Sequence, residues 1–259
     1  MIIKVPASTA NLGPGFDSLG RAVSLYLEVE VLNISDRFQV DHVMPDIPHD
    51  ENNLIVKTAL TVYPGLPPLH LQVKSNIPLA HGLGSSSSAI AAGIELANHF
   101  GKLNLSDKEK VKIGAKIEGH SDNSALTILS GLIVGTEIDN HFDTIKAPLP
   151  DFSLVALVAY VSEYNLPTKK SRNVLPAQLD FKTATHGSAI ANTLVASLFA
   201  KNYQLAGELV EKDAFHEKYR EQLVPELLLV REVAHQKHGL KDQTLILKPD
   251  NNGVQIIED

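Results

Sequence analysis

The spacing of apolar residues predicts strands and one helix near the start of the chain. Tyr26–Leu32 alternates between apolar and polar side chains, which is the period of a strand with one buried face. Ile2–Val5 predicts a second strand, and Phe38–Val43 and Leu69–Lys74 predict two weaker ones. Positions 54, 55, 59, 60 and 62 are apolar, so a helix is expected over Asn53–Val62.

Two further helices are indicated by their ends as well as by their apolar period. Ser86–Phe100 predicts a helix that begins within a run of four serines. Ser106 and Glu109 have the spacing of a capping box, so another helix should begin there. It should run to about Glu118, because Gly119 is a residue that commonly ends a helix.

Two prolines divide the chain into a first and a second half. Leu132–Ile138 and Phe152–Val161 predict strands, and Pro148 and Pro150 lie between them. This punctuation indicates a domain boundary, with units at 1–150 and 151–259.

The second half combines helices with two short strands. Helical periods recur at about 182–200, 203–215 and 225–237. Thr244–Leu247 and Val254–Ile257 predict short strands around the turn Asp250–Gly253. Because both halves contain strands and helices, the chain is predicted to be α+β.

Composition narrows the classes of protein and of site. The 259 residues are 44% hydrophobic and carry a net charge of −7, with no cysteine. The absence of cysteine excludes disulfides, thiolate catalysis and cysteine metal sites. The negative charge argues against a nucleic-acid partner, and no apolar run reaches the length of a membrane span. Without a signal-peptide pattern, we expect an intracellular protein that does not bind membranes.

The segment Pro78–Ala89 carries the clearest chemical signal. Two glycines and four consecutive serines stand directly ahead of the apolar helical pattern Ile90–Ala97. Unpaired amides at a helix start bind anions, and glycines let a phosphate approach the backbone closely. The glycine spacing fits neither the Walker nor the dinucleotide pattern. The alternative is a polar loop whose serines only cap the helix.

Two other segments of the first half carry polar residues in suggestive patterns. Pro6–Gly20 predicts a long glycine-punctuated loop that holds Asn11 and Asp17, although these side chains could simply bond their own backbone. Glu118–Asn123 offers hard oxygen ligands of the kind that Mg²⁺ prefers, or is a polar helix end.

Two basic segments in the second half, Thr168–Arg172 and His216–Arg220, place Arg172 and Arg220 as candidate clamps for a carboxylate. Solvated surface charge is the alternative for each arginine taken alone. A pair of clamps would favour an amino-acid substrate.

Taken in order, these segments resemble the motifs of the kinase superfamily that contains galactokinase, homoserine kinase, mevalonate kinase and phosphomevalonate kinase. Within it, they resemble the homoserine kinase family. Pro78–Ala89 is similar to that family's phosphate loop, Pro-x-x-x-Gly-Leu-Gly-Ser-Ser. Glu118–Asn123 is similar to its Glu-Gly-His-Pro-Asp-Asn motif, with Ser121 in place of proline. Pro6–Gly20 and the two arginine segments resemble the remaining motifs.

The resemblance implies a two-domain fold and a reaction. The first domain should resemble the second domain of ribosomal protein S5, with a left-handed βαβ crossover, and the second should be ferredoxin-like. ATP should lie between them and, with Mg²⁺, phosphorylate the side-chain hydroxyl of L-homoserine, a step in threonine biosynthesis. Family members are cytoplasmic and often homodimers. Two alternatives stay open, a kinase of another small alcohol and a catalytically impaired ligand-binding relative.

The resemblance also implies roles for individual residues. The catalytic residues are expected to be Asn11, Asn123 and Glu118. Substrate binding is assigned to Asn11, Asp17, His120, Asp122, Thr168, Arg172 and Arg220. The metal is assigned to Ser87 and Glu118. ATP binding is assigned to Asn53, Pro78, Leu79, Ala80, His81, Gly82, Leu83, Gly84, Ser85, Ser86, Ser87 and Ser88.

The same chemistry bears on the mechanism. Asp17 should hold the ammonium group of homoserine, and the two arginines its carboxylate. Asn123 stands where related kinases have an aspartate proposed as a base, and an amide cannot take a proton at neutral pH. Because phosphoryl transfer needs little activation of the nucleophile, we expect direct transfer without a protein base.

One family motif has no counterpart in the sequence. The third glycine-rich motif, of the form Leu-Ser-Gly-Ala-Gly-Pro-Thr, should follow His238-Gly239-Leu240, but the chain passes quickly to Gln243–Leu247. Either a stretch between about Leu240 and Gln243 is omitted from the sequence, or the molecule lacks it. We favour omission, because loss of an internal strand would expose apolar faces and edges.

Overall fold

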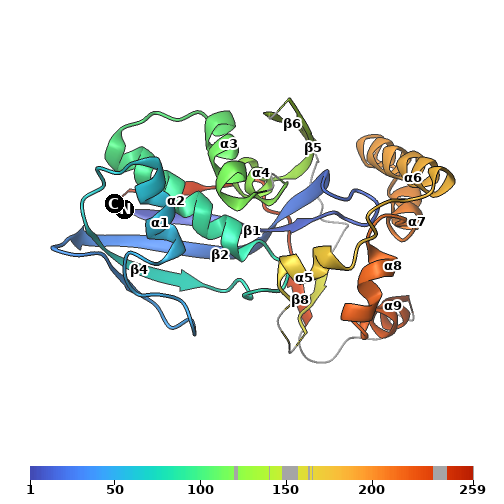
Figure 1. Cartoon of the computed structure of the whole chain (residues 1–259), viewed down its shortest axis with the longest axis horizontal. Helices are drawn as coiled ribbons and strands as arrows, with labels where there is room; N and C mark the ends of the chain where they lie inside the picture. Colours follow the sequence, from blue (N-terminus) through green and yellow to red (C-terminus); the bar gives the residue numbers. More distant parts are fainter. Residues whose placement is uncertain are drawn as a thin grey trace.

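The computed structural model describes residues 1–119, 122–139, 141–147, 157–162, 164, 166–235 and 244–258. Among these residues, a seven-stranded sheet with helices on one face forms the larger part of the molecule (Figure 1). A two-stranded sheet and a group of helices form the smaller part. No helix in the described portion is long and apolar enough to cross a membrane.

The large sheet is antiparallel apart from one parallel pair. Its strands are β1 (Ile2–Ala10), β2 (Leu19–Ile34), β3 (Gln39–Asp41), β4 (Leu69–Ser75), β5 (Leu132–Ile138), β6 (His141–Ala147) and β9 (Gln255–Ile257). The order is β3-β4-β2-β1-β9, and β5 pairs with both β2 and β6. Among the described strands, only β3 and β4 run parallel, joined through the helix α1 (Leu54–Val62).

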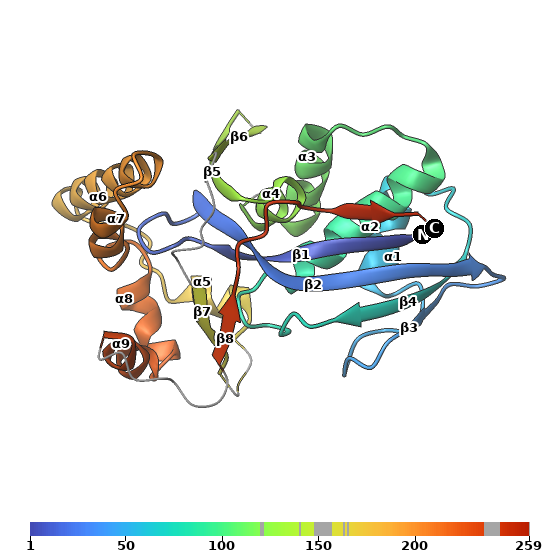
Figure 2. The ribbon, with the colours of Figure 1, turned by 180° about the vertical axis from the view of Figure 1, so that it is seen from behind.

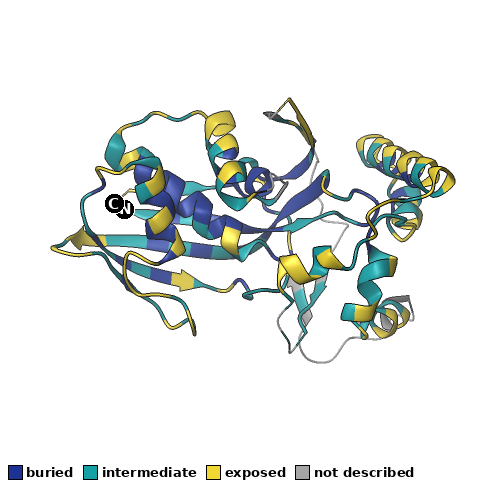
Figure 3. Cartoon of the chain, viewed as in Figure 1, coloured by how far each residue is buried: buried dark blue, intermediate teal, exposed yellow. Residues whose placement is uncertain are grey.

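Helices cover only one face of this sheet, as the two opposite views show (Figures 1 and 2). They are α1, α2 (Ser85–Gly101), α3 (Asp107–Glu118) and α4 (Asp122–Leu129). The burial of β2 alternates along Ser24–Glu30, as expected for a strand with one solvated face. On that solvated face, Lys4 Nζ lies 3.0 Å from Glu28 Oε1. The core therefore lies between the sheet and the helices, where the buried residues gather (Figure 3).

The smaller part is mostly helical. The strand β7 (Leu157–Tyr160) pairs antiparallel with β8 (Thr244–Leu247). The helices are α5 (Thr168–Asn173), α6 (Phe181–Phe199), α7 (Tyr203–Val210), α8 (Glu217–Arg220) and α9 (Leu227–His235), with the 3₁₀ turn η1 (Glu221–Leu223) after α8. The ferredoxin-like prediction requires a larger sheet in this part. Among the described residues, that sheet consists of β7 and β8 alone.

Most predicted elements are confirmed. The capping box at Ser106 is present, and Gly119 ends α3 in the left-handed conformation. The strand at β5 has the predicted bounds, and Asn53 caps α1. The strand β6 was not predicted. The proposed boundary at Pro148 and Pro150 lies outside the described residues, as do residues 152–156 of the strand predicted there.

Two predictions are wrong in detail, and the partners of the two C-terminal strands were not predicted. Pro6–Gly20 is not one long loop, because β1 continues through Pro6 to Ala10 across a bulge and β2 already begins at Leu19. The helix expected over 203–215 ends at Val210. The two C-terminal strands do not pair with each other. The strand before the turn, β8, pairs with β7, and the strand after it, β9, pairs with β1.

Candidate active site

The phosphate loop enters α2 through residues with positive φ. Ala80, Gly82 and Gly84 have φ of 60°, 70° and 68°. Gly84 is the N-cap of α2 and provides no side chain to bond the first amides. The N-cap of α2 is therefore a glycine and not a serine, so helix capping by the serines does not explain the sequence of this loop. The start of α2 therefore has amides without a side-chain cap bond and the positive end of the helix dipole, as an anion site requires.

The two glycines of the loop have different constraints. A Cβ at Gly84 would lie 2.1 Å from Ser8 Oγ, so this glycine is required by close packing of the loop against β1. A Cβ at Gly82 would meet nothing within 4 Å. Gly82 instead borders a cavity, and the open space beside its backbone is where a phosphate would approach.

The four serines have separate roles. The Ser88 hydroxyl is buried and donates to Pro6 O at 2.9 Å, which is a structural contact. The Ser87 hydroxyl donates to Glu118 Oε1, and Ser124 Oγ donates to Glu118 Oε2 at 2.8 Å. Ser85 and Ser86 border a separate hollow. Ser87 is thus the serine whose hydroxyl meets the predicted metal-binding carboxylate.

Opposite helix ends meet at this contact. Ser87 lies in the first turn of α2, whereas Glu118 is the last residue of α3. A carboxylate at a helix C-terminus is electrostatically unfavourable, and a cation there is favourable. The hydroxyl and carboxylate oxygens are also the ligand type that Mg²⁺ prefers, so this pair fits a magnesium ion beside a bound phosphate.

A small hollow of about 100 Å³ lies beside the start of α2. Its walls are mostly apolar and include Leu27, Met44 and Leu79. Asn53 also borders it, but the side chain is already bonded. Its Oδ1 accepts from Ile55 N at 3.0 Å, and its Nδ2 donates to Pro48 O at 2.9 Å. Asn53 therefore shapes this wall through the position of α1.

A larger cavity of about 250 Å³ opens where the two parts of the molecule meet. It collects residues from five segments of the sequence. They are Ala10, Asn11, His81, Gly82, Asn123, Tyr160, Ser162, Tyr164, Leu166, Thr168, Ser171, Arg172, Arg220 and Val224. The phosphate loop, the predicted Asn11 and Asn123, and both predicted arginines thus share one cavity.

The phosphate loop is tied to the second part of the chain beside this cavity. Leu166 N donates to Ala80 O at 3.1 Å. His81 Nε2 lies 2.9 Å from Ser162 O. These contacts hold the loop against the segment that follows β7 and so fix the distance between the anion site and the arginines.

Asn123 is oriented by a buried hydroxyl. Ser8 Oγ donates to Asn123 Oδ1 at 3.0 Å, and Ser8 is fully buried in β1. Because Oδ1 accepts this bond, the NH₂ group is the end of the amide that can donate to a ligand in the cavity. Asn123 is therefore arranged as a hydrogen-bond donor.

Asp17 and Arg172 pair with each other. Arg172 Nη2 lies 2.7 Å from Asp17 Oδ1, and Nη1 lies 3.0 Å from Oδ2, which is a bidentate ion pair. Asp17 does not line the cavity, but it holds the guanidinium that does. Asn11 Oδ1 accepts from Asp17 N at 3.0 Å, so the backbone bonding that was the alternative reading of Asn11 is also present.

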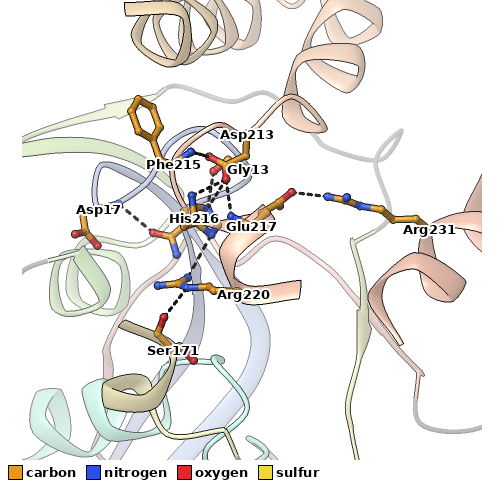
Figure 4. Close-up of polar contacts among 10 residues, drawn as sticks. Gly13, Asp17, Ser171, Asp213, Phe215, His216, Glu217, Arg220 and Arg231 are labelled. Carbon is orange, nitrogen blue, oxygen red and sulfur yellow. Dashed lines mark hydrogen bonds and ion pairs between the residues drawn. The ribbon is translucent and has the colours of Figure 1, made fainter. Parts of the chain in front are cut away.

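Arg220 is held by the segment around His216 (Figure 4). Its Nε donates to Ser171 O at 3.1 Å, and its Nη1 lies 3.3 Å from His216 Nδ1. Phe16 lies beneath both arginines, with its ring centre 5.3 Å from Arg220 Cζ and 5.6 Å from Arg172 Cζ. The loop after β1 thus supports both arginines of the second part.

Some residues of the cavity were missed by the sequence analysis. Tyr160, Ser162, Tyr164 and Leu166 follow or end the apolar strand β7, and Val224 follows η1. Desolvation, with the hydrogen bond and charge of Glu226, raises the pKa of Tyr164 to about 12. Their position in the sequence could have indicated them, because Tyr164 lies just before Thr168, a predicted site residue. The predicted His120 and the side chain of Asp122 lie outside the described residues.

The chain is similar to curated homoserine kinases over most or all of its length. Residues 53–131 match the family described as GHMP kinases N terminal domain. The homoserine kinase of Lactobacillus acidophilus is 70% identical, with 100% of each chain covered. The homoserine kinase of Limosilactobacillus fermentum is 57% identical over 91% of this chain and 81% of that one.

Solved structures give the same result for the fold. A structure from Listeria monocytogenes, also assigned to homoserine kinase, is similar with a TM-score of 0.87 at 36% identity, covering 100% of this chain and 99% of that one. The phosphomevalonate kinase of Streptococcus pneumoniae has a TM-score of 0.63 at 16% identity, over 88% of this chain and 80% of that one. The chain therefore has the α+β GHMP kinase fold.

The full-length alignment also measures a difference in length. It extends over 290 positions, whereas this chain has 259 residues, so 31 positions of the Lactobacillus acidophilus kinase are unmatched. The predicted place of the missing glycine motif, around Leu240–Gln243, lies outside the described residues.

Proposed function

The chain belongs to the homoserine kinase family of the GHMP kinases, and on that premise we propose that it transfers the γ-phosphoryl group of ATP to the side-chain hydroxyl of L-homoserine. The observation that carries this proposal is the cavity of about 250 Å³, which combines the anion site at Gly82 with Asn123, Arg172 and Arg220. An anion site and a carboxylate clamp in one cavity suit a phosphate donor and an amino-acid acceptor.

The zwitterion of homoserine supplies partners for both members of the Asp17–Arg172 pair. We propose that its carboxylate binds Arg172 and Arg220 and that its ammonium group binds Asp17. Substrate binding would then replace one ion pair by two, with Asn11, Thr168, His120 and Asp122 completing the site. Arg172 and Asp17 are 36% and 44% exposed, so this exchange does not require a buried pair to open.

The donor side of the reaction is assigned to the phosphate loop. We propose that the triphosphate binds the amides at Gly82–Ser88 and that adenine occupies the hollow beside Leu27 and Asn53. Ser87 and Glu118 would hold Mg²⁺, which supplies charge neutralisation and orientation of the phosphate oxygens.

The residues in the cavity support transfer without a protein base. Among its described lining residues there is no aspartate or glutamate, and both ring nitrogens of His81 face backbone carbonyl oxygens, those of Leu79 and Ser162. The raised pKa of Tyr164, about 12, keeps its hydroxyl protonated at neutral pH. Asn123 would align the homoserine hydroxyl through its NH₂ group while the new O–P bond forms and ADP leaves. The hydroxyl proton then leaves with the transferred phosphoryl group or to solvent.

Finer aspects of the resemblance stay predictions. These are the ribosomal protein S5-like first domain, its left-handed crossover through β3, α1 and β4, the ferredoxin-like second domain and the division at residue 150. A cytoplasmic homodimer is likewise an expectation from the family.

The test is a coupled assay of ATP consumption with a panel of hydroxy compounds, including L-homoserine, D-homoserine, mevalonate and galactose. We expect Mg²⁺-dependent turnover with L-homoserine and little with the others. Preference for a compound without a carboxylate and an ammonium group would favour another kinase activity of the same superfamily.

A catalytically impaired relative is the second candidate, favoured by the 31 unmatched positions. It would bind ATP and homoserine in calorimetry but consume little ATP. Intact mass spectrometry tests the missing segment directly. A mass near 28.1 kDa would show that the molecule lacks it, whereas a larger mass would support omission from the sequence.

A further inference from the structure

The buried His216 occupies a position that none of the assigned roles explains. It is 6% exposed and lies just before α8, between the loop after β1 and Arg220. Its ring stacks on Phe16 with 5.0 Å between ring centres. Both ring nitrogens have polar neighbours, so the contacts determine which nitrogen carries the proton.

The tautomer follows from the chemistry of the two partners. His216 Nε2 lies 2.9 Å from Gly13 O, and a carbonyl oxygen only accepts, so Nε2 must carry a hydrogen. His216 Nδ1 lies 3.3 Å from Arg220 Nη1, and a guanidinium only donates, so Nδ1 must present its lone pair. The ring is therefore the neutral tautomer with its hydrogen on Nε2.

We propose that neutral His216 is a positioning residue that orients Arg220 for the carboxylate of the substrate and that its protonation releases this orientation. The proposal rests on the proposed function, because it needs Arg220 to bind the homoserine carboxylate. A hydrogen on Nδ1 would oppose the guanidinium hydrogens of Arg220. The affinity for homoserine should therefore fall when acid protonates the ring.

The charged groups around His216 act in opposite directions. Arg220 on α8 and Arg172 on α5, the latter across Phe16, disfavour a protonated ring. Asp213 Oδ2 lies 3.9 Å from Nε2 and favours it. The Asp213 carboxylate, however, accepts backbone N–H bonds from Phe215, His216 and Glu217, which spread its charge. Asp17 is bonded to Arg172, and Glu217 is bonded to Arg231 on α9.

His216 also joins the two parts of the site. Gly13 lies in the loop between β1 and β2. It must be glycine, because its φ is 70° and a Cβ added there would lie 2.0 Å from Val210 O. The bond to the Gly13 carbonyl therefore fixes the ring to the larger part of the molecule, and Nδ1 transfers that position to Arg220.

Two substitutions separate the two contacts. His216→Asn keeps an acceptor near the Nδ1 position but loses the link to Gly13, whereas His216→Gln can donate to Gly13 but loses the acceptor for Arg220. In the coupled assay we expect His216→Gln to raise KM for homoserine ~10-fold, the loss of one hydrogen bond to a charged group. His216→Asn should raise it by less than ~3-fold. KM for ATP should be unchanged in both.

The pH dependence of kcat/KM for homoserine separates the proposed role of His216 from a merely structural one, which would not change it. The ratio of kcat/KM for homoserine between wild type and His216→Asn should fall toward acidic pH, because only the wild type has a ring that protonates. A ratio independent of pH, or equal losses for homoserine and ATP in both variants, would overturn the proposal.

Imidazole ¹⁵N NMR of the wild-type protein provides a test if either variant fails to fold. The His216 signal should have the pattern of the neutral Nε2–H tautomer at neutral pH. A protonated ring or the opposite tautomer would refute the geometry. A wild-type enzyme without homoserine-dependent turnover would instead contradict the proposed function, whatever the tautomer.

Discussion

The two sides of the cavity are built by different means. The side that includes the phosphate loop rests on one extended core between the seven-stranded sheet and the helices α1–α4. Beyond residue 157, the described buried hydrophobic residues are Ile190, Leu194, Ala206 and Leu247. The arginine side is held mainly by polar contacts, such as those of Arg172 with Asp17 and of Arg220 with Ser171. The position of the phosphate loop thus depends on packing, whereas the positions of the two arginines depend on individual hydrogen bonds.

This difference predicts unequal costs for core truncations. Leu96 and Leu194 are both almost fully buried, the first in the extended core and the second in a small cluster with Leu19 and Ala206. Leu96→Ala should lower the free energy of unfolding by about 4 kcal/mol and Leu194→Ala by about 2 kcal/mol, because the smaller cluster relaxes more readily around a cavity. Denaturant unfolding measures both values. Leu194→Ala should also raise KM for homoserine, since Leu12 of the loop after β1 packs on the same cluster.

The contact between Ser87 and Glu118 joins two helices of the packed side, so its loss should affect turnover more than substrate recognition. Glu118→Gln removes the charge at the C-terminus of α3, and we expect kcat to fall by about 10²-fold to 10³-fold. The Mg²⁺ concentration needed for half-maximal activity should rise. Ser124→Ala is the matched control, because Ser124 bonds the same carboxylate but lies outside the phosphate loop. Similar losses in both variants would argue against a metal role for Glu118.

The arginine side should show the reverse pattern. Arg172→Lys keeps the charge but loses the bidentate geometry, so KM for homoserine should rise by about 10-fold to 100-fold while KM for ATP is unchanged. Arg231→Lys is the control, because Arg231 pairs with Glu217 and does not line the cavity. If Arg172→Lys weakened ATP as much as homoserine, the assignment of separate sides would fail.

Substitution of Asn53 should have the smallest effect on activity, and it distinguishes a helix-capping role from a direct contact with adenine. Asn53→Ala removes the N-cap of α1 and should cost about 1 kcal/mol in thermal or denaturant unfolding. Asn202→Ala removes the corresponding cap of α7 and serves as a stability-matched control. Because the Asn53 amide is already bonded at both ends, KM for ATP should change little. A large increase confined to Asn53→Ala would indicate a direct contact with adenine.

Local sequence signals predicted the elements with strong ends or clear periods. The capping box at Ser106, the strand Leu132–Ile138 and the glycine-led entry into α2 depend on residues within one turn or one strand of each other. Strand partners were harder to predict. Nothing near Thr244–Leu247 or Val254–Ile257 indicates that one pairs with β7 and the other with β1, because those partners are distant in sequence.

The sequence alone determined which types of residue make up the site and their order along the chain. These are glycines and serines before a helix, a carboxylate at a helix end and two arginine segments. The tertiary structure alone decided which atoms meet. It paired Asp17 with Arg172 and put His216 between Gly13 and Arg220. These contacts depend on how β1, the phosphate loop and α8 pack together, and packing between distant segments leaves no local pattern in the chain.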